Sequence, residues 1–260
     1  MKSLALPSTL LLAMFNAAPM IVADDLVFFG NLHSHTSYSD GSGTPDQAFT
    51  HARDVAKLDF LAITEHNHRA AEEGATADRR DGVLIGKNPE LYVGPSDTAL
   101  IPTAARFNKD GQFVAFYGQE FSSISKGNHA NVFEIGEVID DQVVPNGRFD
   151  SLLNWLDTHA DSTGKKAILQ FNHAILLDNY GIQYGADDFG GQSAWITKMS
   201  DHVALFEILN GPAMAKNSGN RSDEVIENDF KHYLLLGFHV APTGDQDNHY
   251  FTWGTSTDTR

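Results

Sequence analysis

The chain has 260 residues, enough for one large domain, because α/β barrels commonly reach about 200 to 250 residues without dividing. Hydrophobic residues make up 42% and charged residues 20%, which is typical of a soluble globular protein and excludes a disordered chain or a membrane bundle. The 34 Asp and Glu against 18 Lys and Arg give a formal net charge of −16. A field of that sign repels phosphate backbones, so we expect no nucleic-acid partner.

Residues 1–23 have the pattern of a secretory signal peptide. Lys2 precedes an apolar stretch that ends in Ile21-Val22-Ala23, directly before two aspartates. We expect cleavage after Ala23, a secreted or periplasmic protein and a mature domain over 24–260; an apolar N-terminal helix is the alternative. No other segment approaches the roughly 18 apolar residues that span a bilayer, so we expect no membrane span after signal removal.

Beyond the signal, short apolar runs alternate with longer amphipathic segments, a pattern of βα units around a mostly parallel sheet. The sequence predicts strands over 26–33, 59–64, 112–121, 131–135, 166–171, 202–209 and 237–243, and helices over 44–57, 148–162 and 222–236. The first helix begins with an N-cap at Thr44, a proline at its first position and Gln47 three residues after the cap. Seven strands with interspersed helices favour a barrel over an open sheet.

Two regions carry no regular pattern. Between Asn67 and Asp110 glycines and prolines recur, and the sequence predicts a long irregular segment, either a lid or substrate-binding insertion or a plain surface excursion. The chain ends at TWGTSTDTR without a helix or capping signal, which fits a fragment that continues beyond Arg260.

Histidines and acids stand at the ends of nearly every predicted strand. In GNLHSHTSYSDG, His33 and His35 are two residues apart, so they share one face of a strand, and Asp40 follows closely. Asp247 and His249 repeat the spacing near the other end of the chain. The strands between them contribute His66, Glu120, His129 and His173. Because the strand ends of a β/α barrel gather at one mouth, we expect these nine side chains to meet there.

Nine such groups exceed the three or four ligands that one zinc ion needs, so the sequence predicts two or three divalent ions. The chain has no cysteine, which leaves nitrogen and oxygen ligands suited to Zn, Mn or Fe. Glu120 is the expected bridge between ions. Ions about 3.5 to 4 Å apart deprotonate a bound water, and we expect this metal-bound hydroxide to be the nucleophile, with no catalytic Ser, Cys or Lys.

The ordered stretches HSHTSYSDG, AITEHN, GQEFS, GNHANVFEI, QFNHA, FEILNG and the closing D-x-H resemble the motifs of the polymerase and histidinol phosphatase (PHP) superfamily of metallohydrolases. The similarity covers residues 31–249 and is closest to the exported branch that includes carbaryl-hydrolysing enzymes. It implies an α/β fold, a distorted (β/α)7 TIM-like barrel with a trinuclear metal site at the C-terminal mouth of its strands. It also implies ligand sets of His33, His35 and Asp247; of Glu120, His129 and His173, with Glu120 shared; and of Asp40, His66 and His249.

Two positions depart from the family pattern. Glu65 stands where the family often has Asp, so a longer arm behind the ligands would shift the geometry of His66. Asp245 and Asp247 both lie near the closing histidine; Asp247 keeps the D-x-H spacing, and Asp245 is the alternative.

Other polar residues have ordinary interpretations beside functional ones. Glu207 is a candidate to hold a ligand histidine in one tautomer. Asn172 and Asn210 fit turn residues first and hydrogen-bonding site residues second. His68 and Arg69 are undecided between substrate contact and solvent. Five more histidines fit a surface or half-buried role: His51, His159, His202, His232 and His239.

The leading hypothesis is an exported metal-dependent hydrolase of a small-molecule ester, either a phosphoester or a carbamate or carboxylic ester. Few basic residues lie in the motifs to clamp a phosphate, which slightly favours the carbonyl centre. A non-catalytic periplasmic metal-binding protein is the alternative, and a nucleic-acid proofreading role is disfavoured by charge and export. The sequence does not indicate an oligomeric state.

Overall fold

The structure is a computed structural model that describes residues 26–67, 85–121, 129–145, 147–159, 166–174, 189–211 and 223–255. The predicted signal peptide over 1–23 lies outside these residues, as do His68 and Arg69. In the part of the chain that is described, no helix has the length and apolar character to cross a membrane.

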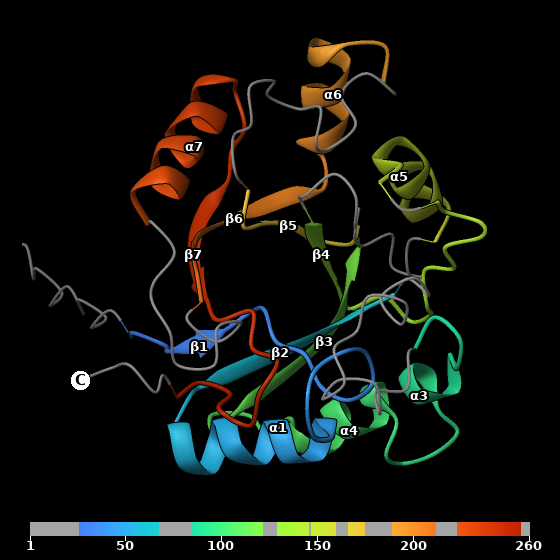
Figure 1. The fold of residues 1–260 in the computed structure, drawn as a ribbon, viewed down its shortest axis with the longest axis vertical. Coiled ribbons are helices and arrows are strands. Elements are labelled where there is room, and N and C mark those ends of the chain that lie inside the picture. The colour runs from blue at the N-terminus through green and yellow to red at the C-terminus, as the bar shows by residue number, and fades with distance from the viewer. Residues whose placement is uncertain are drawn as a thin grey trace, which may run out of the picture.

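Seven strands form one sheet in which each strand pairs with its neighbours in the sequence (Figure 1). They are β1 (Gly30–Asn31), β2 (Phe60–His66), β3 (Val114–Phe121), β4 (His129–Phe133), β5 (Leu169–Asn172), β6 (Val203–Asn210) and β7 (Ala241–Asp245). All neighbouring pairs are parallel except β3–β4 and β4–β5. The predicted mostly parallel sheet is therefore confirmed, with β4 as its one reversed strand.

The two edges of the sheet approach each other just beyond β1 and β7. Ser34 and Asn248 form a parallel bridge, and the His35 backbone N–H donates to the carbonyl of Asn248 at 2.8 Å. The backbone N–H of Leu32 donates to the Asp245 carboxylate at 2.6 Å. These contacts nearly close the sheet into the predicted distorted TIM-like barrel.

Helices surround the sheet (Figure 1). They are α1 (Pro45–His51) with its π-helical continuation η1 (Ala52–Ala56), α3 (Glu90–Val93), α4 (Leu100–Phe107), α5 (Phe149–Thr158), α6 (Gln192–Met199) and α7 (Asp223–Leu235). The predicted capping box is present, because the Thr44 backbone N–H donates to Gln47 Oε1 at 2.9 Å and the Gln47 backbone N–H to Thr44 Oγ1 at 3.3 Å.

Four elements differ from the prediction. The strand predicted over 26–33 is reduced to Gly30–Asn31, and residues 26–29 are 64 to 77% exposed despite their apolar character. The irregular segment predicted from Asn67 to Asp110 is wrong over 90–93 and 100–107, where α3 and α4 form. Pro102 fits α4 because it lies in the first turn, where backbone N–H groups have no partner within the helix. Helix α6 was not predicted.

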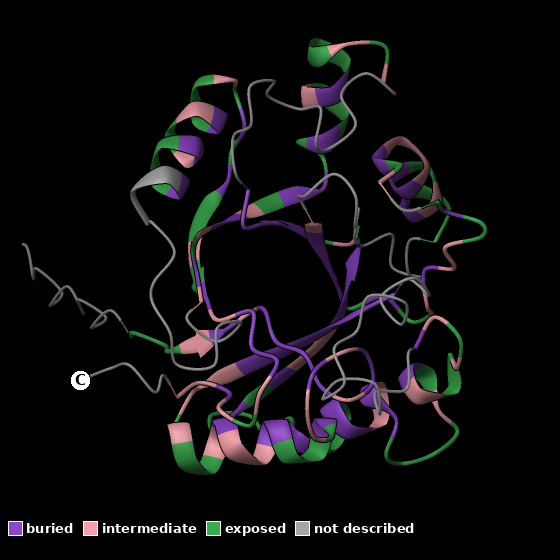
Figure 2. Ribbon diagram, in the orientation of Figure 1, coloured by how far each residue is buried: buried purple, intermediate pink, exposed green. Residues whose placement is uncertain are grey.

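The apolar core lies outside the barrel wall, between strands and helices. Leu169 and Phe171 of β5 pack into a buried cluster with Trp195 of α6, whereas the alternate residues Gln170 and Asn172 make polar contacts in the barrel interior. Figure 2 shows that the wall of the barrel is largely buried. The interior of the barrel is therefore free to carry polar chemistry.

Candidate metal centre

The strand directions bring the predicted ligands to one end of the barrel. His66 is the last residue of β2 and is in register with Glu120 of β3. Because β4 runs antiparallel to β3 and β5, its first residue, His129, lies at this same end, opposite the last residue of β5. His173 directly follows β5. The remaining ligands, His33, His35, Asp40, Asp247 and His249, lie in the segments after β1 and β7.

The buried Glu120 carboxylate is the centre of the cluster, with a side chain only 1% exposed. One oxygen, Oε1, lies 3.2 Å from His33 Nε2, and the other, Oε2, lies 3.2 Å from His35 Nε2. Three more histidine nitrogens surround it: His129 Nδ1 at 3.0 Å, His66 Nδ1 at 3.1 Å and His173 Nε2 at 3.4 Å. One carboxylate therefore contacts five imidazoles, as a bridging ligand would.

A second carboxylate, Asp247, completes the inner group. Its Oδ1 lies 3.3 Å from both His33 Nε2 and His35 Nε2. The ligand atoms of His33, His35, Glu120 and Asp247 all lie within 4.8 Å of one another, and all four residues are buried. The imidazoles of His33 and His35 thus both contact the carboxylates of Glu120 and Asp247. The two histidines lie beyond β1 and not, as the sequence had predicted, within a strand.

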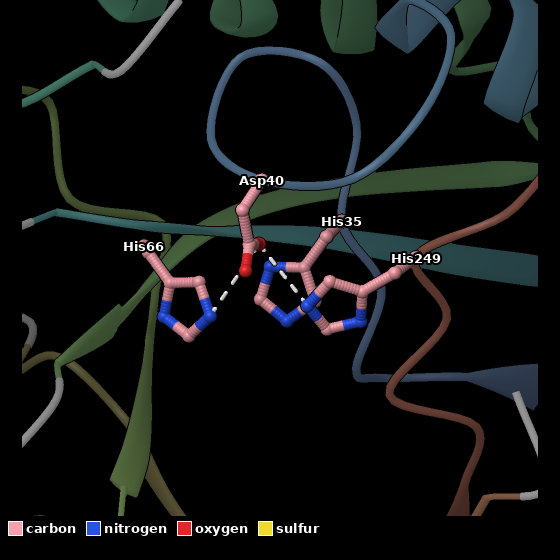
Figure 3. Close-up of side chains that lie close together, drawn as sticks. All are labelled: His35, Asp40, His66 and His249. Carbon is pink, nitrogen blue, oxygen red and sulfur yellow. Dashed lines mark ion pairs between the residues drawn. The ribbon is translucent and has the colours of Figure 1, made fainter. Parts of the chain in front are cut away.

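An outer group lies around Asp40, whose side chain comes from the loop after β1 and points between His66 and His249 (Figure 3). Its Oδ1 lies 3.0 Å from His249 Nε2 and 3.6 Å from His66 Nε2. His35 belongs to this group as well, with its ring centroid 4.2 Å from that of His249. The most accessible members of the centre are Asp40, with a side chain 16% exposed, and His129, with a side chain 19% exposed.

The structure brings all nine predicted residues together, but the compact groups differ from the three predicted ligand sets. His35 is common to the inner and outer groups, and His66 joins Glu120 and His129 in a third. His173 approaches Glu120 without belonging to a compact group. The assignment of each residue to a particular ion stays a prediction.

The geometry fits divalent cations. His35 Nε2 and His249 Nε2 are buried and make no hydrogen bond within the described part of the chain, although carboxylate oxygens lie 3.0 to 3.3 Å away. Ring nitrogens that face carboxylates without hydrogen-bond geometry are placed to share a cation with them. The imidazole and carboxylate ligands match those of Zn, Mn and Fe sites.

The pKa values show how strongly these charges interact. Burial alone would lower the pKa of His35, but the adjacent carboxylates of Asp247 and Glu120 raise it to about 10. The pKa of His33 is raised well above its ordinary value, because the charges of Glu120, Asp247 and Glu207 outweigh burial. Burial would likewise raise the pKa of Glu120, yet the surrounding histidines hold it well below its usual range. The centre therefore attracts positive charge.

A layer of polar side chains holds the ligands from behind. Glu207 accepts a hydrogen bond from His33 Nδ1 at 3.0 Å and from the backbone N–H of His173 at 2.6 Å. His173 has a positive φ of 31°, so this bond also fixes an uncommon backbone conformation. Asn210 donates to Glu207 at 3.0 Å, and Asn172 donates to Glu120 Oε1 at 2.9 Å. Both asparagines therefore hydrogen-bond within the site, whereas the sequence favoured a role in turns. Their position as the last residues of β6 and β5 could have indicated this.

The structure shows the roles of the positions that depart from the family pattern, Glu65 and the pair Asp245 and Asp247. Asp247 faces the histidines, whereas Asp245 accepts hydrogen bonds from the Leu32 backbone at 2.6 Å and from Gln170 at 3.1 Å. The geometry favours Asp247 as the ligand. Glu65 points away from His66 and accepts hydrogen bonds from Thr36 and Ser39 in the loop that carries Asp40.

Three of the histidines assigned to ordinary roles have partners elsewhere. His51 Nε2 lies 3.1 Å from Thr255 Oγ1, and the ring of His159 stacks on Trp155 at 4.0 Å between centroids. The buried His202 pairs with Asp157 at 3.3 Å.

Comparison with models of known families and with curated proteins finds no match to this sequence. Comparison with solved structures finds similar chains at low identity. One is a two-domain protein from Bacteroides vulgatus containing a predicted PHP-like metal-dependent phosphoesterase, with 14% identity, a TM-score of 0.47, and coverage of 86% of this chain and 52% of the other. This chain thus spans about half of that protein.

Two further structures are covered over most of their length. A candidate metal-dependent phosphoesterase from Bifidobacterium adolescentis has 12% identity and a TM-score of 0.40, covering 85% of this chain and 88% of the other. An amidohydrolase from Chromobacterium violaceum, solved with sulfate and no metal, has 12% identity and a TM-score of 0.41, covering 85% and 87%. At these values the function has to be argued from the site itself.

Proposed function

We propose that this protein is a metal-dependent hydrolase that acts on a small ester. The observation that carries the proposal is the contact of one buried carboxylate, Glu120, with five imidazoles at the mouth of a barrel. A single structural ion needs only four ligands in a closed shell, whereas this centre offers nine. Two or three divalent ions, of Zn, Mn or Fe, fit the number and type of ligands.

When bound, closely spaced divalent ions supply an activated water and polarise the bond to be broken. The chain's own residues bind and orient. Glu120 and Asp247 hold the inner histidines within 3.3 Å, and Glu207 fixes the ring of His33 from behind. Asp40 and His129 are the most exposed residues of the centre, so a substrate would enter beside one of them.

The reacting centre of the substrate is proposed from the sequence. The ordered motifs resemble a superfamily rich in phosphoesterases, while its exported branch and the scarcity of basic residues in the motifs favour a carbamate or carboxylic ester. We propose the carbonyl centre first and the phosphoester second. The signal-peptide pattern supports a secreted or periplasmic site of action, where a small diffusing substrate is accessible.

The test is a substrate panel assayed with purified protein, with and without added Mn or Zn. p-Nitrophenyl phosphate, a p-nitrophenyl phosphodiester and an N-methylcarbamate ester represent the three classes. We expect turnover of at least one substrate that a chelator abolishes and added metal restores. Glu120→Gln should lose this turnover, whereas the matched carboxylate-to-amide control Glu137→Gln, at a side chain 57% exposed, should keep it.

Metal content separates the hydrolase from the alternative, a non-catalytic metal-binding protein. Tight binding of two or three ions together with no turnover on any ester would favour the binding protein. Absence of bound ions in protein supplied with Zn or Mn would contradict both.

A further inference from the structure

The loop between β1 and α1 is held by a buried carboxylate on β2, that of Glu65. Glu65 lies on β2 next to His66, and its side chain is fully buried beneath residues 36–41. Oε1 accepts from the Thr36 backbone N–H at 3.0 Å and from the Thr36 hydroxyl. Oε2 accepts from the Ser39 hydroxyl. Three donors therefore converge on one carboxylate.

The direction of these hydrogen bonds decides the position of a proton on His35. An ionised carboxylate can only accept, so the hydroxyl hydrogen of Ser39 points toward Glu65. Ser39 Oγ then has only lone pairs left for His35 Nδ1, which lies 3.5 Å away. In the neutral ring that binds an ion, His35 Nδ1 is therefore the nitrogen that carries the hydrogen, and Nε2, which faces Glu120 and Asp247, keeps its lone pair.

The surrounding backbone leaves little freedom for any other arrangement. The indole N–H of Trp253 donates to the His35 carbonyl at 3.0 Å, and the Gly41 N–H donates to the Thr36 carbonyl at 2.9 Å. A side chain at position 41 would bring its Cβ to 2.6 Å from the carbonyl carbon of His35, so only glycine permits this close turn. The loop that carries Asp40 is thus tightly packed against His35.

We propose that Glu65 and Ser39 are positioning residues that set the tautomer of His35 through the hydroxyl of Ser39, so that Nε2 is free to bind an ion. The inference rests on the proposed function, because the tautomer matters only if His35 holds a metal. His33 is oriented in the same way but directly, because its Nδ1 donates a hydrogen bond to the Glu207 carboxylate. The two histidines of the H-x-H motif are therefore oriented by different carboxylates, one in contact and one through a hydroxyl.

Glu65→Gln is the most direct test, because it keeps the shape of the side chain and replaces one hydrogen-bond acceptor by a donor. The amide oxygen can still accept from Thr36, but the amide nitrogen donates to Ser39 Oγ. The Ser39 hydroxyl hydrogen then turns to His35 Nδ1 and favours the tautomer with hydrogen on Nε2. Loss of such an outer partner typically weakens metal affinity by about 10- to 100-fold, and we expect a loss of this size for Zn at the tightest step that includes His35.

Ser39→Ala removes the link itself, so we expect weaker binding than in the wild type, with no additional loss when Glu65→Gln is introduced into that background. Ser34→Ala is the matched control, since Ser34 is equally buried but donates to Asn31 at 3.1 Å, away from His35. The Zn affinity of Ser34→Ala should equal that of the wild type. Zn affinity is measured by competition with a chromogenic chelator, and the His35 Nδ1–H resonance of the Zn-loaded protein is followed by ¹⁵N NMR.

The outcomes separate the two proposals. Failure of the wild type to bind either Zn or Mn would contradict the proposed function. If the wild type binds Zn, and Glu65→Gln and Ser39→Ala bind it as tightly, the positioning role alone is wrong. Additive losses in the double variant would also overturn it, because the effect of Glu65 would not pass through Ser39. If Glu65→Gln does not fold, the comparison of Ser39→Ala with Ser34→Ala, and the exchange rate of the Nδ1–H, decide the question.

Discussion

Loading of the metal centre should release protons, in a number set by the charges of the site. In the metal-free protein the carboxylates of Asp40, Glu120 and Asp247 face six histidines, and each negative charge favours a protonated imidazole beside it. Three histidines, His33, His35 and His173, have raised pKa values, because neighbouring carboxylates outweigh burial. An imidazole must be deprotonated at the nitrogen that binds an ion.

The size of the effect can be worked out for His35. With its pKa raised to about 10, His35 is still protonated at pH 8 in the absence of metal. Removal of this proton costs roughly 2 pKa units at pH 8, or about 3 kcal/mol at 1.36 kcal/mol per unit. The cost falls with rising pH, so the His35 proton alone should increase the affinity for its ion about tenfold for each pH unit from pH 7 to 9.

Isothermal titration calorimetry counts these protons directly. Zn titrations in two buffers with different ionisation enthalpies, at pH 7 and 8, give the number released from the difference in apparent enthalpy. We expect release of at least the His35 proton at both pH values. Release of none, together with an affinity that does not change between pH 7 and 9, would refute the charge assignment.

Further predictions concern pH, ligands and core. The raised pKa of His35 makes its contribution to the stability of the metal-free protein complete below pH 6.5 and lost as the pH rises through about 10, so the melting temperature without metal should fall over that range and should fall less with Zn bound. Glu120→Gln should reduce the metal content measured by elemental analysis by at least one ion per chain, because five imidazoles lose a shared partner. Asp247→Asn should also lose an ion while Asp245→Asn keeps the full content, and the reverse result would assign Asp245 as the ligand. Leu152→Ala, at a fully buried core position of α5, should lower the free energy of urea unfolding by about 2 to 5 kcal/mol while Zn affinity per folded chain stays unchanged.

The strand ends were predictable because their chemistry is visible without coordinates. Buried strands appear as short apolar runs, and in parallel neighbours their last residues must lie at one edge of the sheet. This is why Glu120 and His66, which are 54 positions apart in the sequence, could be expected together and are found in register. The N-cap at Thr44 was also predictable, since its hydrogen bonds involve residues only three apart.

The sequence could not predict the direction of each strand or the grouping of the ligand side chains. The run that forms β4 has the same composition whether it runs parallel or antiparallel, and only its pairing shows why His129, at the start of a strand, joins groups from strand ends. Helix α6 buries only Trp195 and Met199. Its sequence therefore has no clear amphipathic pattern from which a helix could be predicted. The sharing of His35 between two groups depends on side-chain positions within a few ångströms, which spacing alone does not determine.

The carboxylates of the centre also bear on how many ions it holds. Asp40, Glu120 and Asp247 face the ligand nitrogens, while Glu207 contacts His33 directly and Glu65 is linked to His35 through Ser39. If all five are ionised and the histidines are neutral, as metal binding requires, the cluster carries a charge of −5. A single divalent ion would leave most of this charge uncompensated in a buried site, which is strongly unfavourable. Two ions bring the net charge to −1 and three bring it to +1, so charge balance by itself favours the two or three ions that the number of ligands predicts.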